Sequence, residues 1–237
     1  MSSAVYFIDS CGKVIAMKDL KFKSIFDIIG PVMVGPSSSH TAGAAKIGKI
    51  ARKLFGEEPS DVRVHLYGSF AKTYRGHGTD LAILGGVLGM TPDNVDLAHS
   101  LQVAKRKKIK VVFIPSSDEV PYPNTTKIEL IKDDHHLSVT GESIGGGNIH
   151  ISKIDDFKVN LTPGTNTYVI IQHDIPGMVA SVSRMFSQNN INIATMTVSR
   201  SGEGDKALMI IEVDDVHKGM ASQLRSFPGV ISVNYFD

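Results

Sequence analysis

The chain is organised around the sequence Gly35-Pro36-Ser37-Ser38-Ser39-His40-Thr41-Ala42-Gly43, which sets four hydroxyl groups and a histidine behind a Gly-Pro turn. Apolar residues follow at helical spacing: Ala44, Ala45, Ile47, Ile50, Ala51, Leu54 and Phe55. The positions between them are basic: Lys46, Lys49, Arg52 and Lys53. This pattern predicts an amphipathic helix whose first turn carries the polar cluster.

The place of this polar cluster at a helix start suggests two uses. A helix N-terminus presents unpaired backbone N–H groups and a partial positive charge, which suits a small anion such as a carboxylate or phosphate. The alternative is that one serine simply caps the helix. Capping needs one hydroxyl and leaves the other hydroxyls and the histidine without a role, so we favour a binding site.

The composition leaves room for one large domain or two modest ones. The chain has 237 residues, 42% of them hydrophobic, and a net charge of +1 from 25 basic and 24 acidic side chains. The basic run 105–108 ends a predicted helix, so we interpret it as a solvated helix end and expect no nucleic-acid partner.

Cys11 is the only cysteine, which excludes a disulfide within the chain and fits a reducing compartment. No apolar run approaches the roughly 18 residues of a membrane span, and we find no signal peptide, so a cytoplasmic protein without a membrane partner is expected.

Turn-forming residues divide the chain into four parts. We interpret residues 1–16 as a leader foreign to the natural chain, which would then begin at Met17; a strand is the alternative for their apolar run. Residues 17–160 form a first domain, residues 161–166 a turn-rich linker, and residues 167–237 a second domain.

Helices and strands alternate in the first domain. After a short helix at 24–29 and the helix behind the polar cluster, strands are predicted at 62–67, 111–114, 126–131 and 137–140, with a further helix at 92–106. Glycines punctuate a helical region between residues 68 and 89. Gly145-Gly146-Gly147 lacks the lysine and the following helix of a phosphate loop, so it predicts a turn or bulge.

The second domain has a regular order of elements. Strands are predicted at 168–171, 191–198, 207–213 and 230–235, with helices at 179–186 and 216–226. The order βαββαβ is that of the ferredoxin-like sandwich. The predicted fold class is therefore α+β, with an α/β substrate-binding-type domain ahead of a ferredoxin-like domain.

Two motifs stand out in the second domain: Asp174-Ile175-Pro176-Gly177 after its first strand, and Asn190-Ile191-Asn192-Ile193 at the start of its second. With these motifs the domain resembles an ACT domain, a small amino-acid-sensing module whose ligand site uses these two places, usually across a subunit interface. The resemblance implies that Gly177 lets a helix N-terminus face a carboxylate while Asp174 and Asn192 hold an ammonium and a polar side chain. In the alternative, Asp174 caps the helix, Asn192 ends a strand, and the domain is a plain dimerisation unit.

Three motifs of the first domain belong together: residues 35–43, residues 68–80 (GSFAKTYRGHGTD) and residues 141–147 (GESIGGG). With them, nearly the whole chain from Met17 is similar to the beta chain of bacterial iron–sulfur L-serine dehydratase (L-serine ammonia-lyase), including the terminal ACT domain found in some of these chains. The first domain also resembles the allosteric substrate-binding domain of some phosphoglycerate dehydrogenases.

The resemblance implies deamination of L-serine to pyruvate and ammonia without pyridoxal phosphate. In this family a [4Fe–4S] cluster with one open iron acts as Lewis acid on the substrate hydroxyl, and its cysteines lie in the alpha chain or alpha domain. The single cysteine here agrees with that division, because holding such a cluster takes several thiolates. An alpha-chain partner is therefore expected, and both domains suggest homodimer contacts as well.

The expected roles follow the same motifs. Ser37, Ser38, Ser39 and Thr41, with the helix N-terminus, would bind the serine carboxylate or a neighbouring polar group. His40 and His77 would carry protons or donate hydrogen bonds to the substrate, and Thr41 stands beside them as a catalytic candidate. Asp80 would orient His77 or pair with the substrate ammonium. No third ligand at useful spacing accompanies the two histidines, so no metal site is predicted on this chain.

A rival hypothesis keeps the fold and removes the catalysis. In it, the two domains sense serine and regulate a partner, and no catalytic residue lies on this chain. Carboxylate binding by the polar cluster serves both hypotheses equally. A stand-alone hydrolase using Ser and His is disfavoured, because no matched order of nucleophile, acid and histidine is visible in the sequence.

Overall fold

The computed structural model describes residues 6–8, 14–16, 32–35, 37–201, 206–215 and 219–236. It divides into two compact units, Met1–Gly30 and Pro31–Asp237. In the first unit, β1 (Tyr6–Ile8) pairs antiparallel with β2 (Val14–Ala16), so a strand is present in the apolar run at the start of the chain. The helix predicted at 24–29 lies outside the described residues. No helix in the described part of the chain is long and apolar enough to span a membrane.

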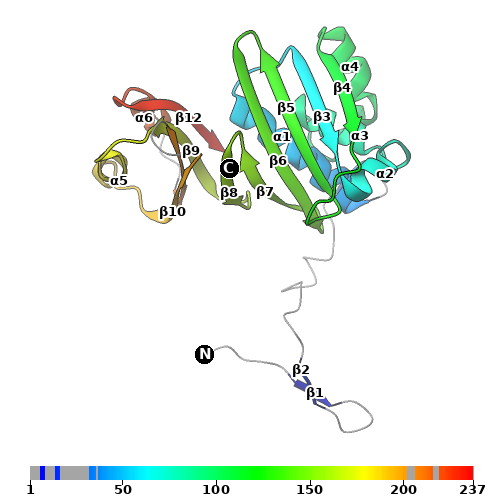
Figure 1. The fold of residues 1–237 in the computed structure, drawn as a ribbon, viewed down its shortest axis with the longest axis horizontal. Coiled ribbons are helices and arrows are strands. Elements are labelled where there is room, and N and C mark those ends of the chain that lie inside the picture. Colours follow the sequence, from blue (N-terminus) through cyan, green and yellow to red (C-terminus); the bar gives the residue numbers. More distant parts are fainter. Residues whose placement is uncertain are drawn as a thin grey trace. The chain divides into compact units, whose positions relative to one another are not determined.

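The second unit begins with a six-stranded sheet (Figure 1). Its strand order is β4 (Lys110–Pro115), β3 (Asp61–Leu66), β5 (Thr125–Lys132), β6 (His135–Gly145), β7 (Asn148–Ile154) and β8 (Phe157–Leu161). β3 and β4 are parallel, because helices connect them, and the other neighbours are antiparallel. The two parallel strands therefore end at the same edge of the sheet.

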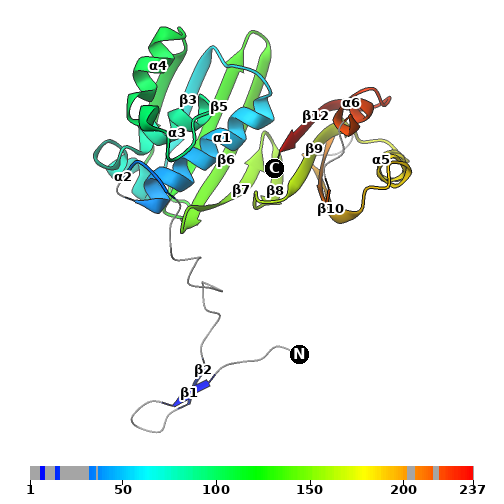
Figure 2. The same ribbon diagram turned by 180° about the vertical axis from the view of Figure 1, so that it is seen from behind.

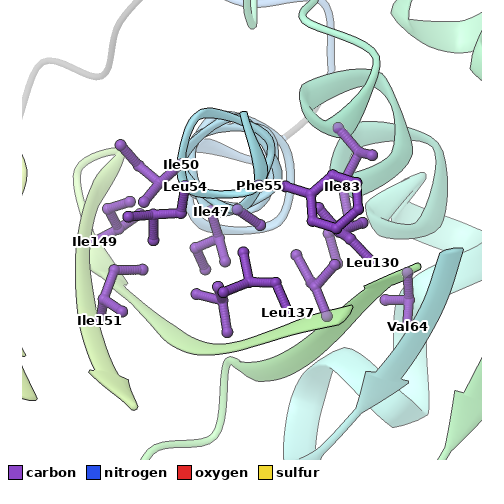
Figure 3. Close-up of a cluster of buried hydrophobic side chains, with 14 of the residues drawn as sticks. Ile47, Ile50, Leu54, Phe55, Val64, Ile83, Leu130, Leu137, Ile149 and Ile151 are labelled. Carbon is purple, nitrogen blue, oxygen red and sulfur yellow. The ribbon is translucent and has the colours of Figure 1, made fainter. Parts of the chain in front are cut away.

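Helices cover one face of this sheet (Figure 2). They are α1 (Ala44–Phe55), α2 (Gly68–His77), α3 (Thr79–Val87) and α4 (Ser100–Arg106). The apolar stripe of α1 faces the sheet, and its Ile47, Leu54 and Phe55 share one buried cluster with Leu130 and Leu137 of the strands (Figure 3). The helix predicted behind the polar cluster is thus confirmed, and burial of its apolar side fixes which way the cluster at its start faces.

α1 and α3 pack closely through glycines. A Cβ atom on Gly48 of α1 would collide with the carbonyl oxygen of Ile83, and a Cβ on Gly86 of α3 would collide with that of Ala45. The backbones approach each other at both points because neither residue has a side chain. This contact joins the second half of α3 to the first half of α1, which follows the polar cluster directly.

A second, four-stranded sheet follows, in the order β10 (Ile193–Arg200), β11 (Lys206–Val213), β9 (Asn166–His173) and β12 (Val230–Phe236). All neighbours are antiparallel, and α5 (Met178–Gln188) and α6 (Met220–Arg225) complete the βαββαβ order. Tyr168 and Phe186 pack edge to face in the core between sheet and helices. The prediction of a ferredoxin-like sandwich is confirmed.

The first domain departs from the sequence-based expectation at two places. The helix predicted at 92–106 is divided into a 3-10 helix (Val95–His99) and α4. The helical region starts later than predicted because the Asn94 side chain caps it, accepting a hydrogen bond from Asp96 N at 2.8 Å. The strand β8 was not predicted. The glycine turn at 145–147 is confirmed between β6 and β7, with all three residues at positive φ.

Candidate functional site

The polar cluster forms a π-helical turn, Ser38–Gly43, that continues directly into α1. Ser37 caps this turn: its hydroxyl accepts a hydrogen bond from His40 N at 3.2 Å, and its carbonyl accepts one from Thr41 N at 2.8 Å. Single turns of π-helix occur frequently at functional sites. The capping interpretation therefore holds for Ser37. Ser38 and Ser39 lie half-buried in the turn and are not its capping residue, so they stay candidates for binding a ligand.

His40 is the centre of the site. The residue is 9% exposed, with Nε2 3.2 Å from Ser69 Oγ and Nδ1 3.4 Å from Ser37 Oγ. Phe70 packs against it edge to face, at 5.2 Å between ring centroids. Ser69 and Phe70 belong to the first turn of α2, which begins directly after β3, so the sheet edge where the parallel strands end positions this contact.

His77, at the end of α2, lies against the same imidazole. The His40 and His77 ring centroids are 4.7 Å apart with an interplanar angle of 89°. Burial lowers the pKa of His40, and the charge of His77 lowers it further. His40 is consequently neutral at physiological pH, with one ring nitrogen able to accept a proton and the other to donate one. The structure thus brings together the two histidines that the sequence singled out.

Two buried hydroxyls beside the turn lack hydrogen-bond partners. Thr41 is 3% exposed and Ser143 is 4% exposed, and neither hydroxyl is bonded within the described chain. A Cβ on Gly43 would collide with Ser143 Oγ, so β6 carries this hydroxyl directly under the turn. Because an unpaired buried polar group is costly, each is a candidate to meet a bound group.

Ser143 lies in the motif at residues 141–147, but no role was predicted for it. It follows Glu142 in β6, a strand that alternates polar and apolar residues over 137–140. Glu142 has a different function: its carboxylate accepts a hydrogen bond from Ser152 Oγ at 2.6 Å and lies 3.0 Å from His150 Nδ1. Adjacent residues of a strand point to opposite faces, which separates the two roles.

Asp80 stands in the first turn of α3, and burial raises the pKa of its carboxyl. Its Oδ1 atom accepts a hydrogen bond from Leu81 N at 2.9 Å. In the described part of the chain Asp80 has no hydrogen bond to His77, so orientation of His77 by Asp80 stays a prediction. The neighbouring Thr79 hydroxyl is fully buried and unpaired.

The ACT-type residues already have partners within the chain. Asp174 forms an ion pair with Arg200, with Nε 2.7 Å from Oδ2 and Nη2 3.1 Å from Oδ1. Asn192 Nδ2 donates to Asp214 Oδ2 at 2.7 Å. Gly177 precedes α5 at φ 89°, as expected for a glycine that opens the helix. An ammonium ligand at Asp174 would have to share its carboxylate with Arg200.

Comparison with known proteins places the chain in a family. A family model described as "Serine dehydratase beta chain" matches residues 24–136, and the ACT domain model matches residues 167–219. The probable L-serine dehydratase beta chain of Bacillus subtilis is 44% identical over 90% of this chain and 98% of its own length. The L-serine dehydratase beta chain of Peptoniphilus asaccharolyticus is 32% identical over 86% of this chain and 91% of its own.

The chain belongs to the serine dehydratase beta chain family. It is a beta chain that carries an ACT domain at its C-terminus. It is also similar to D-3-phosphoglycerate dehydrogenase of Bacillus subtilis, at 29% identity over 82% of this chain and 37% of that protein.

Proposed function

We propose that this chain is the beta subunit of an L-serine dehydratase, an ammonia-lyase that converts L-serine to pyruvate and ammonia in the cytoplasm together with a separate alpha chain. The observation that carries the proposal is the buried His40, held between Ser37 and Ser69 and in ring contact with His77. The names of the relatives, which are L-serine dehydratase beta chains, support the proposed substrate and the proposed alpha-chain partner.

The proposal assigns a [4Fe–4S] cluster to the alpha chain. Such clusters are held by cysteine thiolates, and this sequence contains only Cys11. In the described ranges, no group of three or more His, Cys, Asp or Glu side chains is arranged to hold a metal ion. The residues of this chain therefore do not fit the cluster, and the roles proposed for them are binding, orientation and proton transfer.

The turn at 38–43 is suited to the substrate carboxylate. Backbone N–H groups at the start of a helix point along its axis and carry partial positive charge. The hydroxyls of Ser38, Ser39 and Thr41 lie in the same turn, beyond the cap made by Ser37. A carboxylate bound here would meet several donors at once, and the unpaired Thr41 hydroxyl would gain a partner.

His40 is suited to proton transfer. Deamination of serine removes a proton from a carbon atom, and a neutral imidazole is the form that accepts one. The lowered pKa of His40 keeps that form populated at neutral pH. The ring of His77, whose centroid is 4.7 Å from that of His40, would pass the proton on. The half-buried Asp80 carboxyl would orient His77 or meet the substrate ammonium.

The direct test is anaerobic pyruvate formation from L-serine, measured with this chain alone and after adding an iron-loaded alpha chain. Activity only in the mixture is the expected result. Activity of this chain alone would overturn the proposal that a separate alpha chain is required. No activity in either, with L-serine still bound, would favour the alternative of a serine-sensing regulatory module without catalytic residues.

A further inference from the structure

A pocket unrelated to the histidines lies on the outer side of α1. Its volume is about 450 Å³, and it is lined by α1, by the start of β7 and by the segment between β8 and β9. The lining residues are Lys46, Lys49, Ile50, Lys53, Asn148, Ile149, Thr162, Pro163 and Gly164. The size suits a small ligand rather than a protein segment.

The charged side chains that line this pocket are all basic. Three lysines line it from one helix, and no aspartate or glutamate is among the described residues that form its wall. Within the same described part of the chain, neither Lys46 nor Lys49 has a carboxylate at salt-bridge distance. Lys49 contributes to the lowered pKa of Asp93, but a hydrogen bond with the Thr91 side chain is the largest cause. The charges of Lys46 and Lys49 are therefore not neutralised by the described wall of the pocket.

The ammonium group of Lys46 is partly desolvated without a counter-ion among the described residues. The side chain is half-buried, and burial lowers the pKa of its ammonium group. Desolvating a cation without a counter-ion is unfavourable, and an anion bound beside it would remove that penalty. The polar side chains of Asn148 and Thr162 stand across the pocket and add hydrogen-bonding capacity opposite the lysines.

We propose that this pocket binds a small phosphate dianion, either the free ion or a monoester, held by Lys46 and Lys49 and oriented by Asn148 and Thr162. Lysine is a compact point charge that suits phosphate oxygens, and the two charges of Lys46 and Lys49 match a dianion better than a monocarboxylate. The site is distinct from the His40 site and does not depend on the proposed reaction.

Calorimetric titration of the full chain at constant ionic strength tests the proposal, with inorganic phosphate and glycerol phosphate as probes. Saturable binding of at least one probe is expected. Tighter binding of the ester would identify an organic phosphate as the ligand source, and tighter binding of inorganic phosphate would identify the free ion. Absence of saturable binding by both probes would overturn the proposal.

Variants locate the site. The double substitution K46Q/K49Q should weaken binding at least tenfold, whereas K46R/K49R should retain it because the charges remain. R52Q/K105Q removes two cations that do not line the pocket and should leave the affinity unchanged. Equal affinity in K46Q/K49Q and in the wild type would overturn the proposal.

A measurement on the wild-type chain covers the case in which a variant fails to fold. In amide NMR spectra, phosphate should shift the signals of Asn148, Thr162 and Gly164 in a saturable manner. Shifts confined to another region would contradict the assignment.

Discussion

The imidazole of His40 lies at right angles to that of His77, with their ring centroids 4.7 Å apart, although one residue belongs to the turn before α1 and the other ends α2. Of the pair, His40 is buried and hydrogen-bonded to Ser69, while His77 is exposed. The two rings therefore have unequal environments, which is the arrangement expected when one group handles the substrate proton and the other connects it to solvent.

Replacement of His40 is the first prediction. His40→Ala should reduce turnover of the reconstituted enzyme by about 10²- to 10⁴-fold, the range typical for loss of an acid–base group. The measurement is kcat for pyruvate formation, with circular dichroism to verify the fold. His99→Gln is the matched control, because His99 is exposed and belongs to a separate helix. Near-normal turnover in His40→Ala would remove His40 from the mechanism.

The second prediction concerns the pKa of His40. Burial is the larger cause of its depression and the charge of His77 the smaller one, so His77→Gln should raise the pKa of His40 without restoring the ordinary value of 6.5. Titration of the imidazole signals by NMR measures this. An unchanged pKa of His40 in His77→Gln would show that the two rings do not interact electrostatically.

The same shift makes folding stability depend on pH. A histidine whose pKa is lower in the folded chain binds more protons when unfolded, so the free energy of unfolding rises with pH between the folded pKa and about 6.5. Stability should therefore fall as pH drops through this window. In His40→Gln, denaturant unfolding should show a smaller fall between pH 7.5 and pH 5.5 than in the wild type. Equal pH dependence in both would contradict the depressed pKa.

The fourth prediction tests the close packing of α1 and α3. Gly86→Ala should destabilise the chain by about 1–3 kcal/mol, because the new Cβ meets a backbone oxygen that cannot move aside without parting the helices. Urea unfolding gives the difference. Gly76→Ala is the control: it is also a helical glycine, has nothing within 4 Å of its Cβ position, and should gain up to about 1 kcal/mol.

The fifth prediction concerns the contact of Gly43 with Ser143. Gly43→Ala should destabilise the chain and lower activity, because its Cβ would displace the Ser143 hydroxyl and shift the turn that holds His40. Adding Ser143→Gly should restore part of the lost stability, since the colliding atoms are gone. A double-mutant cycle measures the coupling, and strictly additive effects would mean that the two residues do not meet.

Much of the fold was accessible from the sequence because it depends on local regularities. The apolar spacing of residues 44–55 indicated α1, and alternating residues indicated most strands of both sheets. The exceptions have physical reasons. The Asn94 side chain caps a helix that Pro92 was expected to open, and β8 is a short strand recognisable mainly through its pairing with β7.

The sequence by itself determined which side chains are chemically notable: the serines, His40 and Thr41 at the start of a helix, and His77 in a glycine-rich segment. Tertiary structure alone decided which of them meet. Packing of α2 after β3 brings Ser69 to His40, and packing of β6 beneath the turn brings in Ser143, which had no assigned role. Spacing along a chain reports local geometry, whereas contacts between distant segments depend on how helices and strands bury their apolar faces together.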